Sequence, residues 1–335
     1  MSADPIDFVV TWVDGNDPVW QEAKSHYTTA DADTRPARYR DWEQLKYWFR
    51  AVEKYAPWVN KVHFVTFGHL PKWLNTANPK LHIVKHEDFI SKEYLPVFNS
   101  TAIEIYLHRI PGLSENFVYF NDDFYLMKPS RPEDFFKHGK PVDMPVLSPV
   151  QAGVVGEPYY YHLYNDYSIY VHYFEKKKFL KHLSMYVNFK YGKVAFTNLL
   201  NVACKNLHFD SFHFPKSFQK ASFEIIWRDY EDILQKTAES RFRTNFNNSP
   251  ELFRGYQLIT GNFYPERKAG VYVNTEDVDA AQKAIISANE LFLCLGDNVS
   301  SDTFESARAE INTSFDIVFP EKSSFELGDG GAEKK

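Results

Sequence analysis

The chain has 335 residues, 44% of them hydrophobic and 24% charged, and a formal net charge of −6 at pH 7. This length supports a large buried core, and the acidic balance argues against general nucleic-acid binding. The sequence holds no apolar run of about 18 residues, so no transmembrane helix is expected, and Met1 to Asp7 lack the basic and apolar regions of a signal peptide. The two cysteines, Cys204 and Cys294, lie in apolar surroundings, which predicts buried, inert thiols in a reduced, cytosolic compartment.

Short β-rich runs alternate with helical patterns in the first part of the chain. The expected elements are, in order, a strand at 7–13, a helix from Leu45 that stops before Pro57, strands at 62–67 and 81–84, a helix at 101–109 and a strand at 116–120. Strands that alternate with helices predict an α/β fold with a mainly parallel, Rossmann-like sheet flanked by helices.

The middle of the chain, 151–250, is dense in tyrosine, histidine and lysine, and we expect a mostly helical insertion that forms a substrate subregion. A helix over 174–187 would carry an apolar face, with Lys177, Lys178 and Lys181 largely elsewhere. Such a basic amphipathic helix can rest on an anionic membrane or cover a phosphate-rich cleft. The simpler alternative is a solvated lysine face on a packed helix.

The last part of the chain completes the predicted organisation. It holds, in order, helices at 223–237, 250–259 and 280–288, a buried strand at 291–295 and a helix at 303–315. We divide the chain into a nucleotide-binding α/β part (1–150), the helical insertion (151–250), a part that completes the α/β core (251–322) and a disordered tail (323–335).

Two adjacent carboxylates, Asp122 and Asp123, directly follow the apolar run that ends at Phe120. Unpaired charge at the end of a buried strand is costly, and ligands of open α/β sheets bind beyond the carboxyl ends of the strands. The dyad therefore predicts a divalent cation, Mg²⁺ or Mn²⁺, because these ions take oxygen ligands and keep substrate phosphates in their shell.

Acidic residues also follow two other apolar runs, at Asp14 and Asp297. Either could extend the predicted site. The alternative is that each only caps a turn, because Asp-Gly and Asp-Asn pairs are good turn formers.

Three further residues could act on a phosphate. His213 can take a proton from an attacking hydroxyl or donate to a phosphate, although one histidine among 12 can also be structural. Arg241 and Arg243 flank Phe242, so alternation could send one guanidinium inward and leave the other in water. Surface salt bridging is the alternative for each arginine.

Taken together, four blocks resemble the Stealth family, which includes bacterial capsule polymerases that transfer sugar 1-phosphates and the catalytic core of the animal N-acetylglucosamine-1-phosphotransferase of lysosomal targeting. The blocks are Asp7–Trp20, then the stretch from Arg38-Tyr-Arg-Asp through Phe98-Asn-Ser-Thr-Ala-Ile-Glu104 and Leu107–Ser114 to the dyad, then His213-Phe-Pro215 to Arg241-Phe-Arg243, and finally Leu293-Cys-Leu-Gly-Asp-Asn298. The match spans nearly the whole chain, in order.

The resemblance implies a GT-A-like nucleotide-sugar transferase fold and a phosphotransferase. Its reaction would move hexose or N-acetylhexosamine 1-phosphate from a UDP-sugar, such as UDP-GlcNAc, to a hydroxyl of a glycan or lipid-linked glycan. A phosphodiester would form and UMP would leave, in capsular or exopolysaccharide synthesis. The usual acceptors imply a peripheral contact with the inner face of the plasma membrane.

The resemblance also assigns site residues. It implies Asp122 and Asp123 as metal ligands and Asp14, His213, Arg243 and Asp297 as catalytic residues. The residues expected to bind substrate are Asn121, Arg109, Arg241, Lys216 and Asn298. Between His213 and Asp14 as the base, we favour His213, because an unperturbed histidine has a pKa of about 6.5.

The chain departs from the family pattern at two places. Family members commonly write Asn-Asp where this chain has Gly296-Asp297, and Asp-Val-Asn-Gln where it has Asn247-Asn-Ser-Pro250. We interpret both as a shifted substrate preference. The alternatives are a conventional metal-dependent glycosyltransferase that releases UDP and an inactive relative that only binds glycan.

Overall fold

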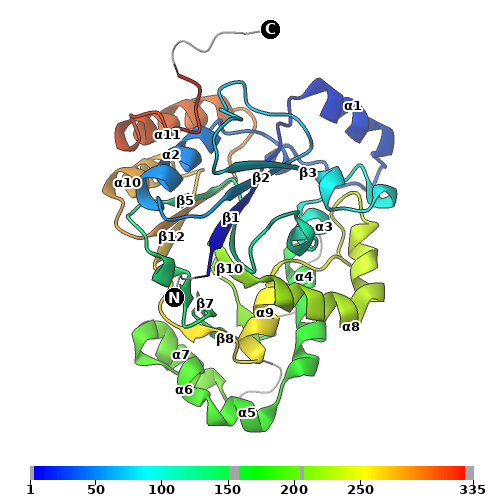
Figure 1. The fold of residues 1–335 in the computed structure, drawn as a ribbon, viewed down its shortest axis with the longest axis vertical. Helices are drawn as coiled ribbons and strands as arrows, with labels where there is room; N and C mark the ends of the chain where they lie inside the picture. Colours follow the sequence, from blue (N-terminus) through cyan, green and yellow to red (C-terminus); the bar gives the residue numbers. More distant parts are fainter. Residues whose placement is uncertain (1–3, 151–157, 204–206, 329–335) are drawn as a thin grey trace.

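The computed structural model describes residues 4–150, 158–203 and 207–328 of the chain. Its centre is a five-stranded sheet in the order β10-β4-β1-β2-β3 (Figure 1). These strands are β1 (Ile6–Thr11), β2 (Val62–Thr66), β3 (Leu81–Lys85), β4 (Asn116–Phe120) and β10 (Lys216–Gln219). The first four run parallel, and β10 adds an antiparallel edge. The predicted α/β class with a mainly parallel sheet is confirmed.

The middle strands of this sheet are buried because their sequences are almost continuously β-branched or aromatic. The buried carboxylate of Asp7 is compensated, since it accepts hydrogen bonds of 2.7 Å from both Asn60 Nδ2 and the backbone N–H of Ser114. Val10 of β1 lies opposite Phe120 of β4. The two strands therefore end side by side, and the residues after them share one edge of the sheet.

A second sheet, β12-β13-β5, brings the C-terminal part of the chain to the dyad. β5 (Phe124–Leu126) begins directly after Asp123 and pairs antiparallel with β13 (Phe292–Gly296), which pairs parallel with β12 (Gly270–Asn274). The backbone N–H of Leu295 donates to the carbonyl of Asp123 at 3.1 Å. The end of β13 is thus fixed beside residues that lie far away in the sequence.

Four helices lie at the end of the molecule drawn uppermost in Figure 1. They are α1 (Pro18–Tyr27), α2 (Leu45–Tyr55), α10 (Val278–Ser287) and α11 (Phe304–Val318), while the short α3 (Ser100–Glu104) lies near the cleft described below. α2 buries Trp48, Phe49 and Val52 in the core, and its Tyr47 stacks on Phe315 of α11 with ring centroids 5.1 Å apart.

The middle of the chain builds the opposite end and one side of the molecule (Figure 1). Its elements are α4 (Pro158–Tyr170), α5 (Lys176–Lys181), α6 (Leu183–Tyr186), α7 (Lys193–Asn201), α8 (Lys220–Ala238) and α9 (Glu251–Ile259), with short strands β6 (Phe136–Lys137), β7 (Lys140–Asp143), β8 (Val146–Pro149), β9 (Leu207–Asp210) and β11 (Tyr264–Pro265). None of the helices in the described ranges is long and apolar enough to cross a bilayer. The predicted division into parts stays a prediction.

Three local predictions need correction. The helix predicted over 174–187 breaks at His182 into α5 and α6, because a turn there brings Phe179 onto the buried Tyr186 with ring centroids 4.4 Å apart. The helix predicted at 101–109 is α3 followed by a separate 3₁₀ turn at Leu107–Arg109.

The third correction concerns the predicted disordered tail. Phe325 is buried and packs on Phe49 at 5.0 Å, and the Glu326 carboxylate accepts two hydrogen bonds from Arg50 at 2.8 and 2.7 Å. The tail prediction is therefore wrong for these residues, because one buried aromatic ring and one ion pair anchor them. Residues 329–335 lie outside the described ranges.

Candidate active site

A cavity of about 400 Å³ opens where β1, β4 and β13 end. Its volume lies within the range of ligand pockets in proteins. The lining includes these predicted site residues: Asn121, Asp122, Asp123, His213, Arg243, Asp297 and Asn298. They come from four distant stretches of the chain, and the fold brings them together because three strand ends meet at this edge.

The dyad makes one part of the cavity strongly acidic. Asp122 is exposed to the cavity, yet protein atoms surround it closely enough that lost hydration raises its pKa to about 8. The neighbouring carboxylates of Asp123, Asp41 and Asp297 add to this rise. A cation would relieve both effects, because it offsets the repulsion among the carboxylates.

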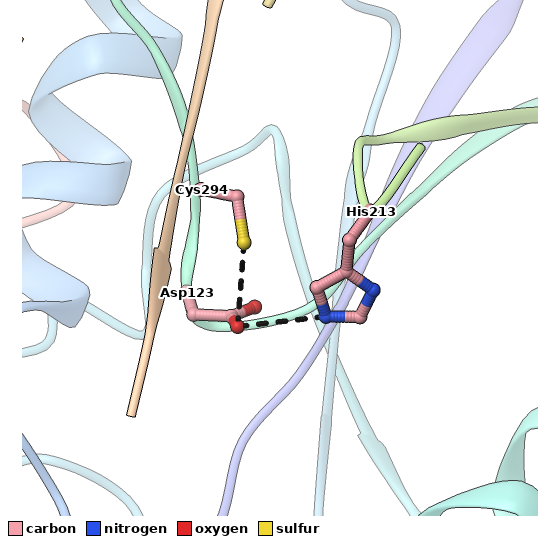
Figure 2. Close-up of side chains that lie close together, drawn as sticks. All are labelled: Asp123, His213 and Cys294. Carbon is pink, nitrogen blue, oxygen red and sulfur yellow. Dashed lines mark hydrogen bonds and ion pairs between the residues drawn. The ribbon is translucent and has the colours of Figure 1, made fainter. Parts of the chain in front are cut away.

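Asp123 contacts two side chains from other segments (Figure 2). Its Oδ2 lies 3.7 Å from Nε2 of His213, on the loop before β10, and accepts a weak hydrogen bond from the thiol of Cys294 at 3.7 Å. Burial, followed by the Asp123 charge, raises the pKa of Cys294, so the thiol stays protonated. The prediction of a buried thiol is confirmed for Cys294, whereas Cys204 lies outside the described residues.

These residues fit a divalent cation. Asp123 Oδ1 is buried and has no hydrogen-bond partner among the described residues, which leaves a carboxylate oxygen uncommitted. Two adjacent carboxylates are the oxygen donors that Mg²⁺ and Mn²⁺ prefer. Asp122 and Asp123 are therefore the residues that would hold the ion, and the ion itself stays a prediction.

Arg243 gives the cavity a basic part. Its Nη2 donates to Ser100 Oγ at the start of α3 at 2.7 Å, and no ion pair of Arg243 occurs among the residues that the structure describes. Burial, followed by the Arg243 charge, lowers the pKa of Arg38. Arg38 pairs with Asp33, and Asp33 also pairs with Arg35. The two guanidinium groups thus carry positive charge that suits phosphate oxygens.

Asp297 is anchored in the wall of the cavity. Its carboxylate accepts a hydrogen bond from Arg40 Nε at 2.6 Å, a second from Arg40 Nη2, and a third from Trp42 Nε1 at 3.0 Å. The Asp297 side chain is 16% exposed. Because both its oxygens are committed, Asp297 positions this wall in the structure, and its predicted catalytic role stays a prediction.

Four predicted residues do not line the described cavity. Asp14 accepts from the backbone N–H of Asn16 at 2.9 Å, as the turn-cap alternative expects, and its charge still contributes to the raised pKa of Asp41. Arg109 lies over the Trp227 ring, 4.6 Å from its centroid.

The other two also have partners elsewhere. Arg241 Nη2 donates to the carbonyl of Leu95 at 3.2 Å, and buried Lys216 pairs with Glu251 at 2.9 Å. The expected substrate contacts of Arg109, Arg241 and Lys216 need correction, since packing and ion pairing hold these side chains away from the cavity.

Several cavity residues had no predicted role. Buried Glu104 accepts a 2.8 Å hydrogen bond from Tyr119 Oη, and burial raises its pKa. The sequence feature that could have pointed to Glu104 is its position as a carboxylate within the apolar helical run Ala102–Ile105. The second block of the family resemblance contains Arg38, Arg40 and Asp41, which line the cavity. The sequence around them does not indicate which residues they contact.

The two departures from the family pattern have structural roles. A Cβ at Gly296 would lie 1.9 Å from the Tyr272 hydroxyl, so glycine allows this tyrosine to approach the backbone. Asn247 Oδ1 accepts from Asn99 Nδ2 at 3.0 Å and from the backbone N–H of Thr244 at 2.8 Å. Asn247 therefore helps to hold the Arg243 segment against the start of α3.

Sequence comparisons give consistent matches. The model for conserved region 1 of Stealth proteins matches residues 4–31, and the model for conserved region 2 matches residues 38–143. The capsular polysaccharide phosphotransferase WcwK of Streptococcus pneumoniae is 38% identical, with 96% of this chain and 98% of that protein covered.

Two further relatives match over similar lengths. The exopolysaccharide phosphotransferase cps2G of Lactiplantibacillus plantarum is 36% identical, with 96% of each chain covered. The receptor polysaccharide phosphotransferase WefC of Streptococcus gordonii is 36% identical, with 96% of this chain and 99% of that protein covered. The solved structure of the galactosyltransferase LgtC is a distant match, with a TM-score of 0.41 and 9% identity over 97% of this chain and 98% of that one.

Proposed function

The chain belongs to the Stealth family, and from this premise we propose that it is a sugar-1-phosphate transferase of capsular or exopolysaccharide synthesis. The donor would be a UDP-sugar that carries a hexose or N-acetylhexosamine. The acceptor would be a hydroxyl of a glycan or lipid-linked glycan at the inner face of the plasma membrane. The names of the full-length relatives support a phosphotransferase.

The proposed reaction breaks the diphosphate and leaves the sugar's anomeric bond intact. The acceptor oxygen bonds to the sugar-bearing phosphorus, and the bond from that phosphorus to the bridging oxygen breaks. That oxygen leaves with UMP, and the acceptor proton passes to a base. Such a transfer depends on in-line positioning and on neutralised charge more than on covalent help from the protein.

His213 is the proposed base. Its ring is about half exposed at the cavity, and Asp123 Oδ2 lies 3.7 Å from Nε2, so a carboxylate is near to stabilise the imidazolium that forms. Arg243 and Arg38 would bind phosphate oxygens and hold the leaving UMP in line. Asp122 and Asp123 would hold Mg²⁺ or Mn²⁺, which when bound neutralises diphosphate charge.

The observation that carries the proposal is the meeting of the carboxylate dyad, His213 and Arg243 around one cavity of ligand size. The test is to incubate the protein with Mg²⁺ or Mn²⁺, a panel of UDP-sugars and a glycan acceptor, and to identify the released nucleotide by ion-exchange chromatography. We expect UMP. Release of UDP would instead indicate transfer of the sugar alone and would overturn the proposal.

A further inference from the structure

The lower end of the molecule exposes apolar side chains. On α7, Phe196, Leu199 and Leu200 are 66%, 55% and 61% exposed, whereas Ala195 and Asn198 on the other side of the same helix are buried. Phe189, just before α7, is 99% exposed. Spacing of three and four residues places the α7 side chains on one helical face. A helix that buries one side and leaves an apolar stripe outward has a face fit for a partner.

The same region is strongly basic. Residues 176–203 contain six lysines and no aspartate or glutamate, although the whole chain has a net charge of −6. Lys176, Lys177, Lys178, Lys181 and Lys193 are exposed. The sixth lysine, Lys190, pairs with Glu266, so a carboxylate already compensates its charge. α5, α6 and α7 lie together at one end of the molecule (Figure 1), so the exposed lysines of α5 and the exposed apolar residues of α7 belong to the same end.

We propose that this region, which we term the basic apolar face, docks on an anionic lipid membrane. The face comprises Phe189, Phe196, Leu199 and Leu200 with the five exposed lysines Lys176, Lys177, Lys178, Lys181 and Lys193. Lysines attract anionic headgroups while apolar side chains enter the boundary with the acyl chains, and the two contributions add. This face would hold the protein at the membrane where its proposed acceptor lies, and in that respect the inference rests on the proposed function.

Charge favours lipid over a second copy of the chain as the occupant. A two-fold dimer pairs the same surface with itself, so it would set the lysines of one copy against those of the other. An anionic bilayer offers negative headgroups to the lysines and an apolar interior to the exposed apolar side chains of the face.

Membrane docking can be measured without turnover. None of the residues of the face is among the described residues that line the cavity. The assay is co-sedimentation of the full chain with vesicles of phosphatidylglycerol and phosphatidylcholine, with pure phosphatidylcholine vesicles for comparison. We expect binding only to the anionic vesicles. The binding should weaken as NaCl rises from 0.1 to 1 M, because the Debye length shortens to about 3 Å.

Two variants test the two contributions. The first replaces Lys176, Lys177, Lys178 and Lys181 with glutamine, and its matched control replaces the exposed lysines Lys72, Lys92, Lys236 and Lys283. Each lysine near an anionic surface changes affinity about fivefold, so the first variant, with four lysines replaced, should lose about 600-fold in vesicle affinity and the control far less.

The second variant carries Leu199→Ser and Leu200→Ser, and its control carries Ile286→Ser and Ile317→Ser at exposed positions of α10 and α11. Vesicle binding should fall at least tenfold in the variant and stay unchanged in the control. Equal binding of variants and controls would overturn the proposal. The proposal would also be overturned, in favour of self-association, if the wild-type chain does not bind anionic vesicles but forms dimers in sedimentation velocity. In that case Leu199→Ser/Leu200→Ser would abolish the dimers. UMP release with a soluble acceptor is measured separately, so docking can fail while the proposed function holds.

Discussion

Arg243→Gln is the change that separates substrate binding from folding most clearly. Among the residues that the structure describes, its guanidinium donates one hydrogen bond, to a neutral group, Ser100 Oγ at 2.7 Å. Loss of such a bond costs about 1 kcal/mol of folding free energy, so in a chain of this length the melting temperature should fall by only about 1–2 °C. Hydrogen bonds from a guanidinium to charged phosphate oxygens are worth about 1.5–3 kcal/mol, so kcat/KM for the donor should fall about 10- to 150-fold.

The chain supplies a matched control two residues away. Arg241 lies over the Tyr27 ring, 4.6 Å from its centroid, and donates to the carbonyl of Leu95 outside the cavity. Arg241→Gln should therefore keep kcat/KM within about threefold of the wild type. The assay is initial-rate UMP release at varied donor, with melting curves of both variants. Wild-type activity in Arg243→Gln, or an equal loss in Arg241→Gln, would refute the assignment of Arg243 to the phosphate.

Three further predictions follow from the same site and from the core. Asp123→Asn should abolish turnover and weaken Mn²⁺ binding, measured by electron paramagnetic resonance, at least tenfold; unchanged Mn²⁺ affinity would contradict the metal assignment. Asp123, His213 and Cys294 offer ligand atoms within 4.8 Å of one another, so Zn²⁺ should inhibit in the presence of Mg²⁺, and Cys294→Ala should raise the inhibitory Zn²⁺ concentration about tenfold; equal inhibition of both proteins would count against a thiol ligand. Burial lowers the pKa of His108 to about 3 in the folded chain. Below pH 6, His108 therefore becomes protonated in the unfolded chain while it stays neutral in the folded one, and the free energy of unfolding falls by up to about 1.4 kcal/mol per pH unit. His108→Gln should reduce the difference in urea unfolding between pH 7 and pH 5, and the exposed His26→Gln should not; an unchanged pH dependence in His108→Gln would argue that this histidine is protonated in the fold.

The sequence allowed the α/β class and the main charged groups of the cavity, the Asp122–Asp123 dyad, His213 and Arg243, to be predicted. Asp122 and Asp123 follow an apolar run of β4, and parallel strands end at one edge, so their place near other strand ends could be inferred. His213 and Arg243 were inferred from their chemistry and from the family resemblance. In each case a local pattern or a recognised block carried the information.

Contacts between distant segments carried no comparable signal. Arg40 and Asp297 are 257 positions apart, and neither neighbourhood indicates that one neutralises the other. Cys294 reaches Asp123 only because β13 pairs antiparallel with β5, a pairing that strand patterns do not specify. In the tail, a composition rich in Gly, Glu and Lys obscured the single buried ring of Phe325.

The position of an isotopic label after one turnover tests the central claim most directly. The donor is a UDP-sugar with ¹⁸O at the oxygen that joins the sugar's anomeric carbon to phosphorus. If the chain transfers sugar 1-phosphate, ¹⁸O enters the glycan product within a phosphodiester, visible by phosphorus NMR, and the released UMP carries none. Recovery of the label in released UDP, with no phosphodiester in the product, would contradict the account.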